Sequence, residues 1–103
     1  MERTQGGSRP ETVSPTGDID LATAGQVENM IVEALRSQGG AGVVVDLSRV
    51  EFLDSAGVRT LLRGRKLANE LGALFSVTGA NGIVKQVLEM TGVWDYLSGP
   101  IDG

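Results

Sequence analysis

The sequence has neither cysteine nor histidine, and its only aromatic residues are two Phe, one Tyr and one Trp. Without cysteine there is no disulfide framework, no thiolate metal site and no cysteine nucleophile. Without histidine the chain lacks the commonest general base and metal ligand. We therefore expect a protein that is not an enzyme.

Long apolar runs and an excess of positive charge are also missing. No segment approaches the roughly 20 apolar residues that a membrane-spanning helix needs. Residues 1–16 have no apolar centre of the kind found in a secretory signal. The formal net charge of −4 argues against nucleic acid or an anionic membrane as a partner. These features predict a cytoplasmic location.

The first part of the chain is polar and rich in Gly, Ser and Pro. We expect residues 1–10 to form a flexible arm and residues 11–103 to form one domain. Between Pro10 and Pro15 only a short strand can pair, at a sheet edge, because proline lacks a backbone donor. Residues 17–20 are predicted to turn the chain.

Three segments repeat apolar residues at helical spacing. The first begins at a cap formed by Asp20 or Thr23 and ends at Gly39-Gly40, and its apolar stripe is Val27, Met30, Ile31, Ala34 and Leu35. The second runs from Ser55 to Leu71 before Gly72, with a core face of Val58, Leu61, Leu62 and Leu71. The third is capped by Asn81 or Thr78, ends at Gly92, and repeats Ile83, Val84, Val87 and Leu88.

Two continuous apolar runs, 43–47 and 74–78, predict buried strands. Residues 93–97 are predicted to form a short turn or strand. Strands and helices alternate with short links, which indicates an α/β fold. We expect a mostly parallel or mixed sheet of about four strands, flanked by about four helices, with a shortened first edge strand.

The strand-to-helix junction at Asp54-Ser55-Ala56-Gly57 is the most informative motif. One interpretation is a plain helix cap, since Asp and Ser both favour that position. A nucleophilic serine is disfavoured because no histidine is present and no motif links Lys66 or Lys85 to it. The third interpretation is a phosphoacceptor, because a phosphoryl group at a helix start meets free backbone N–H groups and the positive end of the dipole.

The chain resembles the anti-sigma factor antagonists, whose fold is the STAS domain. The resemblance rests on Gly17-Asp18-Ile19-Asp20, on Val45-Asp46-Leu47-Ser48 followed by Phe52-Leu53-Asp54-Ser55-Ala56-Gly57, and on Met90-Thr91-Gly92-Val93. It implies that Ser55 is the regulatory phosphoserine. It also implies two partners: an anti-sigma factor that acts as serine/threonine kinase, and a metal-dependent serine/threonine phosphatase that resets the cycle.

The same resemblance implies a partner-binding surface around Ser55. Asp20 matches an acidic residue of the family near the phosphorylation site, and Asp54 precedes the acceptor. Ala56 and Gly57 are expected to keep the surface low, so that a partner approaches closely. Three basic residues follow at helical spacing: Arg59, Arg63 and Lys66. One interpretation is that they form a solvent-exposed helix face, and the other is that they form a strip that contacts the partner.

Two alternatives remain at this stage. The same fold also suits a scaffold or sensor domain in a larger signalling assembly. The turn from Thr78 to Gly82 superficially resembles a dinucleotide-binding loop and would serve a small-molecule-binding domain. Its glycine spacing is not that of the dinucleotide fingerprint, and too few residues follow for a second βαβ unit. We therefore expect no cofactor and no metal site.

Overall fold

Strands and helices alternate along the structure, a computed structural model that describes residues 10–37 and 41–98. Within these residues it contains five strands and four helices. The strands are β1 (Glu11–Val13), β2 (Gly17–Ile19), β3 (Gly42–Asp46), β4 (Val50–Leu53) and β5 (Leu74–Thr78). The helices are α1 (Ala24–Leu35), α2 (Ser55–Leu71), α3 (Gly82–Met90) and α4 (Trp94–Ser98). The α/β class predicted from the sequence is confirmed.

The strands form two parallel sheets, and strands of one sheet alternate with strands of the other along the chain. One sheet has the order β1-β3-β5, and the other pairs β2 with β4. The prediction of a turn at residues 17–20 is wrong for Gly17–Ile19, which form β2. Ile19 pairs in register with Leu53, and both side chains are fully buried. This burial explains why a segment rich in turn-forming residues is extended.

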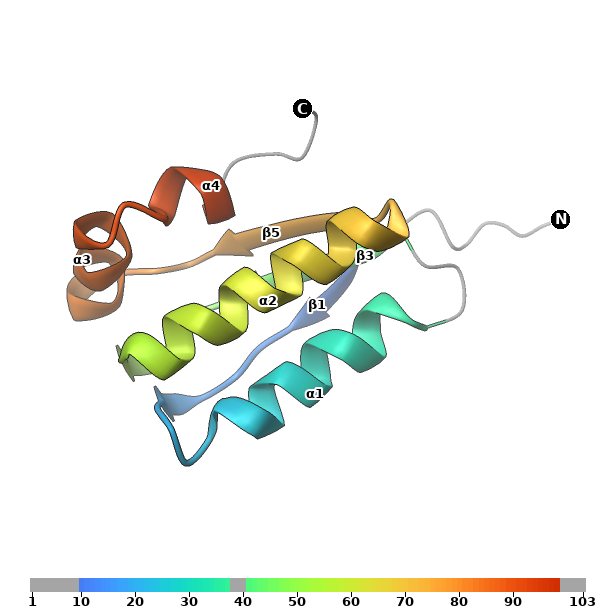
Figure 1. Cartoon of the computed structure of the whole chain (residues 1–103). Coiled ribbons are helices and arrows are strands. Elements are labelled where there is room, and N and C mark those ends of the chain that lie inside the picture. Colours follow the sequence, from blue (N-terminus) through green and yellow to red (C-terminus); the bar gives the residue numbers. More distant parts are fainter. Residues whose placement is uncertain (1–9, 38–40, 99–103) are drawn as a thin grey trace, which may run out of the picture.

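Helices α1 and α2 lie side by side against one face of the β1-β3-β5 sheet (Figure 1). α4 packs near β5, and α3 packs against β4. The core lies between α1, α2 and the strands, and its fully buried side chains include Ile19, Ile31, Val43, Val45, Leu47, Leu53, Leu61, Phe75, Val77 and Leu88. Most of these side chains come from the predicted apolar runs and stripes.

Gly64 explains why a glycine stands in the middle of α2. A Cβ atom at this position would lie 2.8 Å from Cε2 of Phe75 and 3.0 Å from Cγ2 of Ile31. These distances are shorter than ordinary contacts, so the absent side chain lets α2 approach β5 and α1 closely. The loss of helix propensity, about 1 kcal/mol relative to alanine, is the cost of that packing.

The helix boundaries agree with the sequence pattern to different degrees. α2 has the predicted bounds, and Gly72 ends it with a positive φ of 70°. α1 ends at Leu35, and the predicted terminator Gly39-Gly40 lies outside the described residues. Residues 1–9 of the predicted arm also lie outside them. α3 has Asn81 at its N-cap position, but that side chain makes no capping hydrogen bond.

Three expectations about the core and the end of the chain are corrected. Leu71 and Met30 were placed on the core faces, but 49% and 38% of their surfaces are exposed. Each lies at the edge of its helix's apolar stripe, where the neighbouring elements do not cover it. Residues 94–98 form α4 rather than a turn or strand, which lets Leu97 reach the core and become fully buried.

Arg65 is a buried cation that the apolar pattern of α2 did not reveal. Its side chain is only 8% exposed. The guanidinium Nη1 donates to the main-chain oxygen of Tyr96 at 2.6 Å and, more weakly, to that of Phe75 at 3.4 Å. The guanidinium also lies 4.6 Å from the centroid of the Tyr96 ring. Arg65 therefore links α2 to α4 and to β5.

Candidate functional site: the start of helix α2

Ser55 is the first residue of α2 and is exposed to solvent. It follows β4 by one residue, so the buried Leu53 fixes the backbone just before it. The hydroxyl therefore stands at a defined place on the surface, where an enzyme can reach it. This is the geometry that a modifiable serine requires.

Asp54 is the N-cap of α2. Its carboxylate oxygen Oδ1 accepts hydrogen bonds from the backbone N–H groups of Ala56 at 2.9 Å and Gly57 at 3.1 Å. Ser55 itself is therefore not the cap. The idea that a phosphoryl group on Ser55 would meet free N–H groups is corrected for these two amides, because the Asp54 carboxylate already occupies them.

The parallel pairing of β2 and β4 places Asp20 close to this helix start. Ile19 and Leu53 are register partners, and Asp20 and Asp54 are the residues that follow them. The backbone N–H of Asp54 also donates to the main-chain oxygen of Ile19 at 3.2 Å. The two acidic residues therefore lie at the same end of the β2-β4 sheet, where Ser55 follows Asp54.

Asp20 is itself held in a tight local network. Its Oδ1 accepts from the backbone N–H of Ala22 at 3.0 Å and of Thr23 at 3.2 Å. The Thr23 hydroxyl donates to the main-chain oxygen of Asp18 at 2.8 Å. The half-buried Asp20 therefore stabilises the loop that leads into α1, but it does not cap this helix, because Thr23 is at the N-cap position and makes no side-chain capping hydrogen bond.

Gly57 lies inside the protein rather than on the predicted partner surface. It is buried, and a Cβ atom there would lie 2.5 Å from Cδ1 of Leu53 and 2.7 Å from the main-chain oxygen of Ile19. Its lack of a side chain lets the first turn of α2 rest on β2 and β4. Gly57 therefore presents little surface to a partner, whereas Ala56 is half-buried and remains at the surface.

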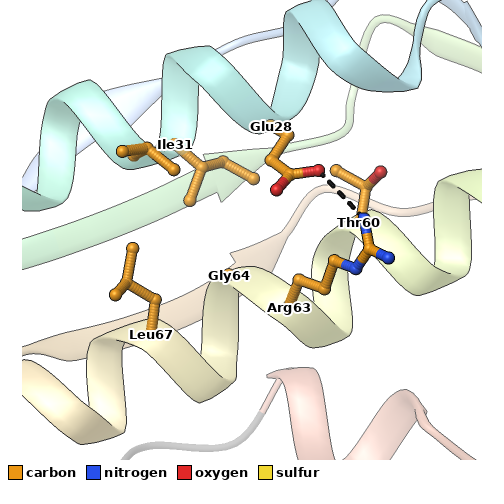
Figure 2. Close-up of a pocket in the computed structure, with 7 residues that line it drawn as sticks. Glu28, Ile31, Thr60, Arg63, Gly64 and Leu67 are labelled. Atoms are coloured by element: carbon orange, nitrogen blue, oxygen red, sulfur yellow. Dashed lines mark hydrogen bonds and ion pairs between the residues drawn. The ribbon is translucent and has the colours of Figure 1, made fainter.

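The predicted basic strip on α2 divides into cations with different surroundings. Nη1 of Arg63 lies 3.4 Å from Oε1 of Glu28, across the gap between α2 and α1. This pair borders a cavity of about 240 Å³ lined by Glu28, Ile31, Val32, Thr60, Arg63, Gly64 and Leu67 (Figure 2). Arg59 and Lys66 are exposed, and the described residues contain no ion pair of Arg59.

Two exposed apolar side chains, one directly after Asp20 and one just before Asp54 in the chain, have no counterpart among the predicted surface residues. Leu21, in the loop after β2, is 81% exposed, and Phe52 of β4 is 42% exposed. Phe52 pairs in register with the exposed Asp18, so these side chains share the outer face of the β2-β4 pair. Leu21 falls outside the apolar period of α1, and that is the one sequence signal that separates it from the core.

The glycine-containing turn after β5 is packed against the end of β3. A Cβ atom on Gly79 would lie 2.5 Å from Oδ1 of Asp46. That oxygen accepts from the backbone N–H of Ser48 at 2.9 Å. Hydrogen bonds from the Ser48 backbone and hydroxyl, with help from Arg49, hold the pKa of Asp46 below its ordinary value. The turn is therefore a structural junction, and its geometry gives no support to nucleotide binding.

Among residues 10–37 and 41–98, no three acidic side chains gather closely enough to hold a metal ion. No helix in the same part of the chain is both long and apolar enough to cross a membrane.

The fold is a small α/β domain with parallel strands, and its candidate site is an exposed serine at the start of the helix that follows β4. Residues 3–98 match the family described as "Mlab, STAS domain". The chain therefore belongs to the STAS domain family, and the resemblance noted from its motifs is confirmed at this level.

Two known proteins are similar to this chain. It is 29% identical over 82 residues to the "Anti-sigma F factor antagonist" of Paenibacillus polymyxa, which covers 80% of this chain and 70% of that protein. Its fold is similar to the structure titled "Structure of the Anti-Sigma Factor Antagonist SpoIIAA in its Unphosphorylated Form". That match has a TM-score of 0.61 at 19% identity and covers 80% of this chain and 76% of the other.

Proposed function

We propose that this protein is an anti-sigma factor antagonist whose binding is switched by phosphorylation of Ser55. The unmodified protein binds an anti-sigma factor that is also a serine kinase, and the sigma factor is thereby released. A metal-dependent phosphatase restores the unmodified form. The role is one of binding in the cytoplasm, without catalysis by this chain. The exposed hydroxyl of Ser55 at the fixed start of α2 is the observation that carries the proposal.

The surface around Ser55 suits a switch of this kind. Leu21 and Phe52 supply apolar area, and Asp18, Asp20 and Asp54 supply negative charge. A phosphoryl group adds a charge of about −1.5 to −2 at neutral pH. Burying that charge in an interface without a matching cation costs several kcal/mol. Because each ~1.4 kcal/mol is a tenfold change in affinity, phosphorylation abolishes tight binding.

The fold need not change for this to happen. Asp54 already caps α2, and the Ser55 hydroxyl makes no hydrogen bond to another described residue. A phosphoryl group on that oxygen therefore breaks no side-chain hydrogen bond among the described residues. The modified and unmodified proteins then differ in charge at one point rather than in architecture.

Phosphorylation is tested by incubating the protein with the anti-sigma kinase of its own organism and ATP, followed by mass spectrometry of the peptides. We expect one phosphoryl group on Ser55, absent from Ser55→Ala. Ser48→Ala is the matched control, because Ser48 is also exposed but lies in a turn. Phosphate on another residue, or none with a kinase shown to be active, would contradict the proposal.

Binding is tested with the same kinase by calorimetry. Leu21→Asp should weaken binding by at least about tenfold, the loss expected of a central apolar contact. Met90→Asp is the control, because Met90 is 78% exposed but lies at the end of α3. If the two variants bind equally well, Leu21 does not belong to the contact surface.

A further inference from the structure

Arg59 stands one helical turn after Ser55 on α2. Residues four apart on a helix lie on the same face, about 6 Å apart along the axis. Helical side chains also tilt toward the helix N-terminus, so the side chain of Arg59 leans toward Ser55. An anion at the first position and a cation four residues later is the favourable order for such a pair.

The nearest alternative partners of a phosphoryl group on Ser55 are already engaged. The Asp54 carboxylate occupies the N–H groups of Ala56 and Gly57. Arg63 lies a further turn away, about 12 Å from Ser55 along the axis, and pairs with Glu28. Arg59 is exposed and has no ion pair within the described part of the chain.

We propose that Arg59 becomes the counter-ion of phosphorylated Ser55, which removes this cation from the partner surface at the moment the negative charge is added. The proposal rests on the proposed phosphorylation of Ser55 and describes how the switch is built. A guanidinium binds a phosphoryl group through two parallel hydrogen bonds, so it is well suited to the role.

The double change of charge distinguishes this switch from simple repulsion. Before modification, Arg59 is available to an acidic group on the partner. After modification, it is held by the phosphoryl group, and the partner meets a negative charge where a positive one had been. The acidic groups on neighbouring elements, Asp18 of β2, Asp20 after β2 and Asp54, all oppose the new charge, and Arg59 offsets part of that repulsion.

The experiment uses full-length protein with phosphoserine encoded at position 55, so no kinase is needed. The second pKa of the phosphoryl group is measured by ³¹P NMR at low salt. A nearby cation stabilises the dianion and lowers this pKa. We expect Arg59→Gln to raise it by about 0.15 to 0.4 of a unit, the size that an exposed pair of this spacing implies. Arg59→Lys should give an intermediate value.

Arg63→Gln is the matched control and should leave that pKa unchanged. Added salt should shrink the difference between the parent protein and Arg59→Gln. In ¹⁵N spectra, the Nε–H signal of Arg59 should shift on phosphorylation while that of Arg63 stays in place. If Arg59→Gln leaves the pKa unchanged, or if Arg63→Gln alters it equally, the proposal is overturned.

This outcome is separable from that of the kinase experiment. Encoded phosphoserine reports on Arg59 even if no kinase modifies Ser55. Conversely, a kinase that phosphorylates Ser55 with no effect of Arg59 on the pKa would support the switch and reject this counter-ion.

Discussion

The start of α2 and its middle differ in how far their side chains are exposed and how tightly they are packed. In the first two turns, Ser55 and Arg59 are exposed, and the Asp54 carboxylate holds the backbone of the first turn. In the middle, Gly64 lies tight against Phe75 and the Arg65 side chain is buried beneath Tyr96. The comparison teaches that one helix contains a region where charge can change without loss of packing and another where it cannot.

The largest change in the free energy of unfolding should come from shortening a buried side chain of α2. Leu61 is fully buried, so Leu61→Ala should lower the free energy of unfolding by about 2–5 kcal/mol. Leu71→Ala is the control on the same helix, and because Leu71 is 49% exposed its loss should be well below that range. Urea denaturation measures both. Equal losses would show that the core extends farther along α2 than the structure places it.

A smaller loss of stability is expected for the buried Arg65 than for Leu61, and a still smaller one for the exposed Arg59 of the same helix. Arg65→Ala removes the 2.6 Å bond to the main-chain oxygen of Tyr96 and the packing of its stem. We expect a loss of about 1–3 kcal/mol in the free energy of unfolding, against no more than about 0.5 kcal/mol for the exposed Arg59→Ala. Hydrogen exchange should also rise in α4 of Arg65→Ala. A stable Arg65→Ala with unchanged exchange would remove the proposed link between α2 and α4.

The smallest effect concerns the cap of the first turn. Asp54→Ala leaves the N–H groups of Ala56 and Gly57 without their acceptor, which should cost about 1 kcal/mol of stability. Asp54→Asn keeps an oxygen at that place and should lose less. Thermal unfolding followed by circular dichroism compares the two variants. If asparagine is no better than alanine, the carboxylate charge rather than the hydrogen bonds stabilises this turn.

Much of the architecture could be predicted because its signals are local. The continuous run before Asp46 predicted β3, and the apolar period from Ser55 to Leu71 predicted the bounds of α2. β2 was missed because three residues of a turn-like sequence become a strand only through pairing with β4. Such pairing depends on residues distant in the sequence, and a segment of three residues is too short to show an alternating apolar pattern.

The position of Ser55 at the start of a helix could be predicted from the sequence, but the surroundings of this residue could not. Ser55 follows from the strand-to-helix junction, and Asp54 from the ordinary preference of caps. The burial of Gly57 was not visible, since its space is taken by Leu53 and Ile19 from two strands. The exposure of Leu21, and the absence of an ion pair between Arg59 and another described residue, depend on which elements come near these side chains. A single sequence pattern does not encode this.

The bond from Arg65 to α4 ends on a main-chain oxygen and not on a side chain. Every amino acid carries that oxygen, so substitution of Tyr96 removes the ring but leaves the acceptor in place. Substitutions of Tyr96 in α4 therefore leave the acceptor of this hydrogen bond in place, whereas substitution of Arg65 removes its donor. Among related chains, this predicts a constant arginine on α2 facing a variable residue on α4.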